Sequence, residues 1–566
     1  MAADHTHYPD YANPELLDKI PLSARVVLDV GCAQGALGEA YLRRNPRARM
    51  LGIDADPASA AHAATRLTEV ICCDVEDQPM PFAVPEGIDC IIYGDVLEHM
   101  VDPWALLAAH APYLNPDATV LVCMPNVEHW SFAFSLLSGR FDYQDQGLFD
   151  RTHLRWFTPR MMRQALSDAG LAPTDLVSRP IDKADAERFT TIMAPALKAL
   201  GIDPADYLNR AGPLQFIWRA RKTIPARLLV EASMLEPQGG VSDVRVIEPM
   251  RGLQSDSAML ATIREESAMA PAIADTPRIA VLHRAMLLGD NGVARIKALL
   301  AKGYVIVTEF DDDPDFMIAR GVPMDQLLTF KGVHAVQTST APLAELLRAH
   351  NPETALFANA IFQLPPVHNF NDPERLTMIF AAFNRGEDWA PLMPAINDVA
   401  RLVGERLHFE VLHDQAFFDA LETPHKAFTP LCDYAAYIEK LGHADLAFMP
   451  LADNKFNRAK SDLKFIEASS CRVASLASRV VYQDSIVDNT TGLLFGNAQE
   501  LRTVLLRLLA YPEASRRMAD NARAYVAAQR MLAYQVQPRI DWYRSLWDRR
   551  EALTAALAAR VPALFD

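Results

Sequence analysis

Short apolar runs alternate with Ala-rich helical stretches along the first part of the chain, and such runs are typical of buried strands. This alternation predicts a parallel sheet with helices on both faces, because each crossover between parallel strands needs a helix. The predicted strands are 26–30, 50–53, 70–73, 88–93, 119–124 and 214–218. The expected fold of this part is therefore α/β and doubly wound.

The same alternation resumes after the basic stretch 219–222 and Pro225, which is expected to lead out of the first lobe. Two further doubly wound units follow, with a seam at Pro365 and Pro366. Their strand-like and helical runs are 227–234, 246–253, 279–282, 292–302, 304–310, 377–383, 408–412, 445–451 and 473–476. The predicted domains are 1–223, 224–365 and 366–566, the last with terminal helices.

The first predicted strand ends in a carboxylate, Asp29, and then breaks into small residues. Glycines let backbone amides approach a ligand closely, as in nucleotide sites. A nicotinamide-binding fingerprint needs glycine at 31, 33 and 36, but this chain has Ala33 and Ala36. Its glycines stand at 31, 35 and 38, with an acid two residues before the first. That pattern resembles motif I of class I S-adenosylmethionine (SAM) methyltransferases.

The resemblance implies SAM as cofactor, bound at the carboxyl ends of the strands. Asp54 ends the second strand, where its carboxylate can accept both ribose hydroxyls, and Asp74 follows the third, where it can face the adenine. An isolated Asp at a strand end more often caps a helix, but several in this order behind a glycine turn favour a cofactor site. The implied cofactor-binding residues are Asp29, Gly31, Cys32, Gly35, Asp54, Ala55, Asp74, Val75 and Asp95.

Two later stretches add to the resemblance. Residues 95–103 read DVLEHMVDP, which resembles the corresponding stretch of O-methyltransferases such as the ubiquinone-pathway enzymes. Residues 148–158 read LFDRTHLRWFT, which looks like a stretch of methyltransferases encoded with sugar-polymer machinery. Within it, Arg151 and Arg155 can hold an anionic group such as a phosphate, or they can be exposed salt-bridge partners.

Methyl transfer requires alignment of the acceptor oxygen with the methyl group and removal of a proton. Histidine is the natural base near neutral pH, which makes His99, His129 and His153 candidates. The motif context favours His153 and His99, together with the neighbouring Glu98, as catalytic residues.

In the carboxyl-terminal part, residues 459–468 read AKSDLKFIEA and residues 490–495 read TTGLLF. With the two predicted doubly wound units, these stretches resemble the GT-B class of glycosyltransferases. In that class the corresponding helix start faces a sugar-nucleotide donor. The resemblance implies that Lys460 and Lys464 neutralise the leaving diphosphate and that Glu467 accepts the ribose hydroxyls.

Other residues extend or qualify this donor site. Arg385, after the predicted strand, can add a further cation, and Gly240 belongs to a second glycine loop and is also expected to bind substrate. Lys460 and Lys464 stand four residues apart, as on any solvated helix face. The acid that commonly precedes the ribose glutamate by eight residues is Ala459 here.

The run 305–313 ends in carboxylates, and Asp311 with Asp313 fits the metal-binding DxD pattern of the other large glycosyltransferase class. The carboxyl-terminal motif favours GT-B, in which a similar acidic run occurs without metal. Asp311 is therefore a catalytic candidate, and neither half of the chain is expected to require a metal.

The composition limits the binding partners and the cellular location that we expect for this protein. The 566 residues are half hydrophobic and carry a formal net charge of −16, which argues against a general binder of nucleic acid or anionic membrane. The seven cysteines are scattered, so neither a disulfide framework nor a CxxC zinc site is visible. No apolar stretch reaches the roughly eighteen residues of a membrane span, and the first twenty residues carry acids. We expect a reduced, cytoplasmic protein with no membrane span and no export.

These observations predict a two-enzyme fusion: a SAM-dependent O-methyltransferase followed by a GT-B glycosyltransferase. Because the two share one chain, we expect them to act on one acceptor, a bacterial surface glycan or glycoconjugate, with a nucleotide sugar as donor. One alternative is a methyltransferase carrying a catalytically degenerate, glycan-binding second half. Another is a methyltransferase that acts on a quinone-like small acceptor.

Overall fold

The computed structural model describes residues 10–566 except 181–182, 235–239, 272–275, 315–320, 322, 324–325, 368–373 and 384. The chain divides into two compact units. The first holds Met1–Ala226 with Ser255–Ala258, and the second holds Arg227–Gln254 with Met259–Asp566. Every helix in the described ranges is too short or too polar to span a bilayer.

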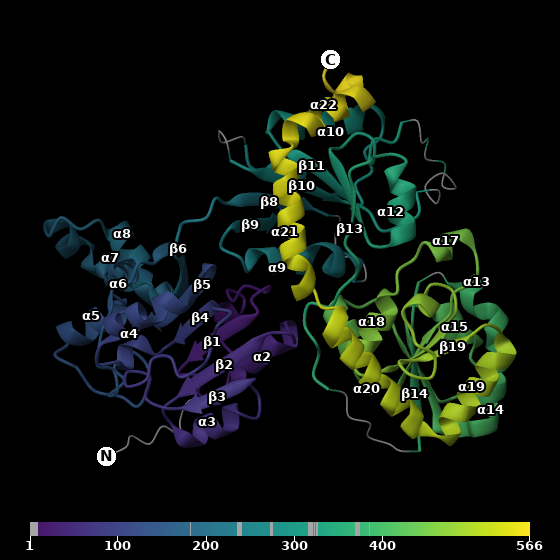
Figure 1. Ribbon diagram of the computed structural model, residues 1–566, viewed down its shortest axis with the longest axis horizontal. Helices are drawn as coiled ribbons and strands as arrows, with labels where there is room; N and C mark the ends of the chain where they lie inside the picture. Colours follow the sequence, from purple (N-terminus) through teal and green to yellow (C-terminus); the bar gives the residue numbers. More distant parts are fainter. Residues whose placement is uncertain are drawn as a thin grey trace. The chain divides into compact units, whose positions relative to one another are not determined.

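A sheet of seven described strands forms the centre of the first unit, in the order β3-β2-β1-β4-β5-β7-β6 (Figure 1). Strands β1 to β5 pair in parallel, whereas β7 runs antiparallel between β5 and β6. The strands are β1 (Val26–Val30), β2 (Arg49–Asp54), β3 (Glu69–Cys72), β4 (Ile88–Gly94), β5 (Leu114–Pro125), β6 (Ala172–Pro180) and β7 (Pro213–Arg221). The α/β class expected from the alternation is confirmed.

Strand β1 shows why this sheet is covered on both faces. All five of its residues are buried. Val26, Leu28 and Val30 pack in one core, and Val27 packs in the other, because alternate side chains point to opposite faces of a sheet. The covering helices are α2 (Ala36–Arg44), α3 (Pro57–Ala63), α4 (Pro103–His110), α5 (Trp130–Leu137), α6 (Pro159–Asp168), α7 (Lys183–Ala199) and α8 (Pro204–Ala211).

Two Asp-Pro pairs start the helices that follow β2 and β4. Asp56 accepts a hydrogen bond from Ser59 N at 2.8 Å, and Asp102 accepts one from Ala105 N at 3.0 Å. In each helix a proline occupies the first helical position. A backbone N–H at that position makes no hydrogen bond within the helix, so proline, which has no N–H, costs nothing there. The Asp-Pro end of the stretch 95–103 is therefore explained by a helix start.

Two parallel sheets, each of six described strands, build the second unit (Figure 1). Their orders are β13-β12-β11-β10-β8-β9 and β16-β15-β14-β17-β18-β19. The first contains β8 (Leu228–Ser233), β9 (Met259–Ile263), β10 (Arg278–His283), β11 (Val305–Glu309), β12 (Ala335–Thr338) and β13 (Thr354–Leu356). The second contains β14 (Leu376–Ala381), β15 (Leu407–Leu412), β16 (Lys426–Thr429), β17 (Leu446–Met449), β18 (Ala474–Ser478) and β19 (Leu493–Phe495).

The last helices of the second unit return to its first sheet. Leu557, Val561 and Leu564 belong to the same core as Ile306 of β11, whereas Leu501 of α19 and Met518 of α20 pack in the core of the second sheet. The helices of this unit include α9 (Glu248–Gln254), α10 (Gly289–Ala301), α12 (Ala341–Arg348), α14 (Met393–Val403), α16 (Tyr434–Leu441), α18 (Leu463–Ser470), α19 (Ala498–Ala510), α20 (Pro512–Gln529), α21 (Ala533–Asp548) and α22 (Arg550–Arg560).

Candidate functional site

The chain turns sharply after β1 through residues 31–35, here called the elbow. Gly31, Ala33 and Gly35 have φ values of 68°, 46° and 82°. Glycine adopts this left-handed conformation without strain, whereas alanine rarely does. The N–H of Gly31 donates to the carbonyl of Ile53 at 2.8 Å, so the elbow lies against the end of β2.

Packing gives a reason for both glycines of the elbow. A Cβ at Gly31 would lie 2.5 Å from Cγ2 of Val96, and one at Gly35 would lie 3.2 Å from Cα of Ala63. Cys32 is buried in the core, and its N–H donates to the carbonyl of Ile53 at 3.0 Å. The glycines therefore serve the fold as well as any close approach of a cofactor.

Asp54 fixes the elbow from the end of β2. Its carboxylate accepts hydrogen bonds from Ala33 N at 2.8 Å and Asp56 N at 2.9 Å. Asp29 is 3% exposed, and burial together with the charge of Asp54 raises the pKa of Asp29 to about 7. A carboxylate offers about four acceptor positions, so backbone donors and ribose hydroxyls can share Asp54. The elbow and these acids fit an adenosyl cofactor at the carboxyl edge of the sheet.

The other candidate cofactor residues differ in exposure. Ala55 and Asp74 are exposed, whereas Val75 is buried in the core. Asp74 accepts a backbone N–H two residues along the chain at 2.9 Å. Asp95 follows β4 with a φ of 55° and accepts a hydrogen bond from Gln215 Nε2 at 2.7 Å. Burial raises the pKa of Asp95.

Glu98 lies in a single 3-10 turn, Leu97–His99, and is 2% exposed. Neither of its carboxylate oxygens has a hydrogen-bond partner among the described residues. Burial raises the pKa of Glu98 well above its ordinary value. Its backbone carbonyl accepts hydrogen bonds from Leu154 N at 2.8 Å and Arg155 N at 2.9 Å, which joins the stretch 148–158 to the turn after β4.

That junction brings His153 beside His99, with ring centroids 4.8 Å apart. The ligand atoms of Glu98, His99 and His153, here called the Glu-His-His cluster, all lie within 4.8 Å of one another. Nδ1 of His99 lies 3.0 Å from the hydroxyl of Thr152, which donates to Asp150 at 2.6 Å. Burial lowers the pKa of His153. The structure therefore brings together the three residues that the sequence favoured for catalysis.

The remaining polar candidates of the first unit lie outside this cluster. Arg151 forms an exposed ion pair with Asp145, and Arg155 donates to the carbonyl of Val101. His129 is buried at the start of α5, with Nδ1 2.7 Å from a serine hydroxyl two residues on. Both arginines are thus engaged within the protein.

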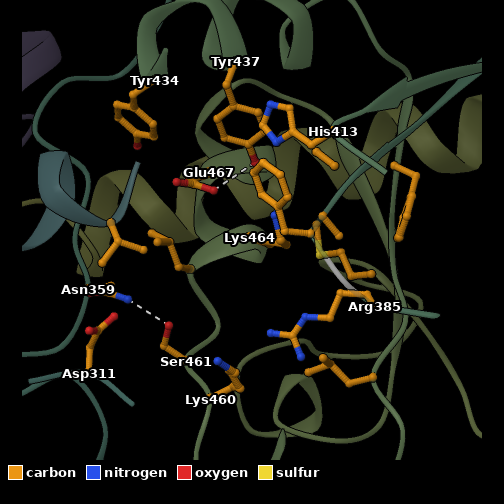
Figure 2. Close-up of a pocket in the computed structure, with 18 of the residues that line it drawn as sticks. Asp311, Asn359, Arg385, His413, Tyr434, Tyr437, Lys460, Ser461, Lys464 and Glu467 are labelled. Atoms are coloured by element: carbon orange, nitrogen blue, oxygen red, sulfur yellow. Dashed lines mark hydrogen bonds between the residues drawn. The ribbon is translucent and has the colours of Figure 1, made fainter. Parts of the chain in front are cut away.

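The second unit contains a pocket lined by strand residues of its second sheet and by residues that follow strands of its first sheet, such as Arg284 and Asp311 (Figure 2). Asn359 and Ser461 meet across it, with a hydrogen bond of 2.8 Å. The charged and aromatic residues that line it include Arg245, Arg284, Asp311, Asp312, Arg385, His413, Tyr434, Tyr437, Lys460, Lys464 and Glu467. Four of the candidate donor-site residues therefore share one cavity.

Helix α18 presents Glu467 to this pocket. Glu467 is 3% exposed and accepts a hydrogen bond from the hydroxyl of Tyr437 at 2.9 Å. Burial raises its pKa, although nearby Lys464 opposes the shift. The start of the helix is held by Asp462, whose carboxylate forms an ion pair with Arg530 at 2.5 Å.

The cations of the pocket have different partners. Nζ of Lys460 lies 2.8 Å from Asp312, a residue that follows β11 in the other half of the unit. Arg385 donates to Asn457 at 3.1 Å, and Nζ of Lys464 lies 5.6 Å from the ring centroid of Tyr437. The cations therefore line the cavity while contacting neighbouring side chains.

Asp311 pairs with a guanidinium. Its carboxylate lies 2.6 Å from Arg284, which also reaches Asp312 at 3.0 Å. Burial alone would raise the pKa of Asp311, but Arg284 holds it below its ordinary value. Asp313 is also buried. Asp311 is thus placed as an ionised, arginine-bound carboxylate at the pocket wall.

Two small residues shape the same region. Gly240 has a φ of 80°, and a Cβ there would lie 2.7 Å from the ring of Tyr434. Ala459, which replaces the common acid, is buried, and its carbonyl accepts a hydrogen bond from Thr340 at 3.1 Å. Tyr434 and its neighbours on α16 were not identified from the sequence, because no local pattern marks a tyrosine that reaches a glutamate on a distant helix.

Residues 6–176 match a family model described as a methyltransferase domain. Similar curated proteins include the ubiquinone biosynthesis O-methyltransferase of Neisseria meningitidis, 30% identical over 176 residues, which are 29% of this chain and 72% of that protein. Another is the same enzyme of Stutzerimonas stutzeri, 26% identical over 28% of this chain and 70% of that protein. The chain spans only 44% of the trans-aconitate 2-methyltransferase of Escherichia coli, at 32% identity.

Solved structures are also similar to parts of this chain. HepE of Anabaena, in complex with UDP and glucose, is 12% identical with a TM-score of 0.41, covering 56% of this chain and 100% of that one. A SAM-dependent methyltransferase of Archaeoglobus fulgidus is 17% identical with a TM-score of 0.27, covering 37% of this chain and 90% of that one. By the family match and the Neisseria relative, the chain belongs to the methyltransferase family through its amino-terminal part.

Proposed function

We propose that the chain is a bifunctional enzyme, a SAM-dependent O-methyltransferase in residues 1–223 joined to a nucleotide-sugar-dependent glycosyltransferase in residues 224–566. Family membership and O-methyltransferase relatives support the first activity. The pocket of the second unit is the observation that carries the second activity, because cations and a buried carboxylate converge there.

In the first unit, the elbow and Asp54 hold the cofactor at the carboxyl edge of the sheet. When bound, SAM supplies the methyl group and leaves as its demethylated thioether. The acceptor hydroxyl must lose its proton. Glu98 and His99 of the Glu-His-His cluster come shortly after Asp95, which follows β4, and packing places His153 beside them.

In the second unit, Lys460, Lys464 and Arg385 neutralise the diphosphate that leaves, helped by the N-terminus of α18. Glu467 accepts the ribose hydroxyls. Its carboxylate already accepts one phenol hydrogen bond, and its remaining acceptor positions suit a diol. Asp311, kept ionised by Arg284, is the candidate carboxylate for a sugar hydroxyl.

A bacterial surface glycan or glycoconjugate is the acceptor that both activities would share. This step rests on the two sites belonging to one chain and on the stretch 148–158, which resembles methyltransferases encoded with sugar-polymer machinery. Cytoplasmic nucleotide sugars and SAM are the small molecules such an enzyme requires.

Mass spectrometry of small molecules retained by the purified protein tests the proposal. We expect SAM or its demethylated product together with a nucleoside diphosphate. Labelled sugar nucleotides should be hydrolysed or transferred by the wild type and not by Lys464→Met, whereas the exposed Lys297→Met on α10 should keep the activity. Donor binding without turnover in the wild type would instead identify a degenerate, glycan-binding second half.

A further inference from the structure

We propose that Glu98, His99 and His153 form a binding site for one divalent transition-metal ion that holds the acceptor oxygen. The role of the ion rests on the proposed methyl transfer, whereas its binding does not. The proposal replaces the expectation from sequence that neither half requires a metal.

The donor atoms of the Glu-His-His cluster and their spacing support a metal site. Two imidazoles and one carboxylate are the ligands of many zinc and iron sites that keep open positions for substrate. In such sites the ligand atoms lie about 2.0–2.2 Å from the ion and hence roughly 3–4 Å from one another. The three ligand atoms here lie within 4.8 Å of one another, so small side-chain rotations would close the site.

The environment of Glu98 also supports a bound cation. It is 2% exposed, and neither carboxylate oxygen has a hydrogen-bond partner among the described residues. A buried polar group without a partner is rare, since its lost hydration is not replaced. A cation between Glu98 and the two histidines would supply the missing interaction.

The contacts of His99 also support a role as a metal ligand. Its Nδ1 lies 3.0 Å from the hydroxyl of Thr152, and that hydroxyl donates to Asp150 at 2.6 Å. When Nδ1 carries the proton and donates to Thr152, the lone pair is on Nε2. Metal-binding histidines are commonly oriented in this way by a partner on their other ring nitrogen.

The ion changes what the cluster does during methyl transfer. It binds the acceptor hydroxyl oxygen and lowers its pKa, so that the hydroxyl proton leaves to solvent water. The oxygen then forms a bond to the methyl carbon while the carbon–sulfur bond breaks and its electron pair goes to sulfur. An acceptor with two neighbouring hydroxyls, as in a sugar, can fill two open positions.

Metal titration of the full chain tests the site without substrate. After removal of bound metal with a chelator, calorimetry with Zn²⁺ should give one site, and Co²⁺ should give a visible spectrum typical of nitrogen ligation. Glu98→Gln and His153→Ala should each weaken binding at least 10-fold. His443→Ala, an exposed histidine of the second unit, should bind as the wild type does.

Two results would overturn the proposal: a wild type that binds neither ion stoichiometrically, or binding that both variants retain. The cobalt spectrum of the wild type keeps the test decisive if a variant fails to fold. Metal binding by a protein that binds no SAM would contradict the proposed methyltransferase while leaving the ion site intact. Methyl transfer by a protein that binds no metal would contradict the ion site while leaving the proposed methyltransferase intact.

Discussion

The charge of Asp29 allows a quantitative test of the elbow. Asp29 is 3% exposed, and burial with the nearby charge of Asp54 raises its pKa from 3.8 to about 7. The unfolded chain therefore releases this proton near the ordinary pKa, whereas the folded unit keeps it up to neutral pH. Because the folded pKa is the higher one, this stability is fully present below the unfolded pKa of 3.8, is lost progressively as pH rises to about 7, and changes little above that.

Each pH unit between the two pKa values is worth ~1.4 kcal/mol, so ionised Asp29 lowers the free energy of unfolding by ~4 kcal/mol above pH 7. Asp29→Asn keeps the shape of the side chain and carries no charge. Without cofactor, the variant should match the wild type only below about pH 4, exceed it by ~1.6 kcal/mol at about pH 5, and exceed it by up to ~4 kcal/mol in mild alkali.

Urea unfolding at about pH 5, 6.5 and 8 measures this difference. The transition to follow is the one that the demethylated cofactor shifts, since it reports the first unit. Asp77→Asn, at an exposed position, serves as the matched control and should show a constant difference from the wild type. A difference between Asp29→Asn and the wild type that is also constant with pH would refute a proton on Asp29 in the folded unit.

Three further predictions follow from single contacts. Gly31→Ala places a Cβ 2.5 Å from Val96 in a left-handed backbone, so we expect ~1–3 kcal/mol of destabilisation in urea unfolding. Glu467→Gln keeps a hydrogen-bond acceptor for Tyr437 but removes the charge. The binding free energy of a nucleoside diphosphate, measured by calorimetry, should weaken by ~1.5–3 kcal/mol, and an unchanged affinity would contradict the role of Glu467 at the ribose. Thr152→Val removes the hydroxyl beside His99 and should weaken Zn²⁺ binding about 10–100-fold, and equal affinity would argue against that support.

Much of the fold follows from sequence because central parallel strands are buried on both faces and form continuous apolar runs. Strands β1, β4, β10 and β11 were found in this way. Edge strands were harder to predict. Thr354–Leu356 and Lys426–Thr429 are short and only partly buried at the margins of their sheets, so their residues lack an apolar pattern.

The acids at strand ends could be proposed from sequence because parallel strands bring their carboxyl ends to one edge. The partners of those acids could not. Tyr437 reaches Glu467 from another helix, and Arg284 reaches Asp311 from another strand end, contacts that depend on how the elements pack. The ionisable residues could be identified from the sequence, whereas the packing of the elements determines which of them carry charge.

The stretch 148–158 shows how packing changes the meaning of a motif. From sequence, its arginines were candidates for holding an anion. In the structure Arg151 pairs with an aspartate, and the backbone of residues 154 and 155 binds the carbonyl of Glu98. That bond positions His153 beside His99, and Asp150 and Thr152 orient the ring of His99. The two motif stretches therefore lie together in the structure, and their contacts form the Glu-His-His cluster.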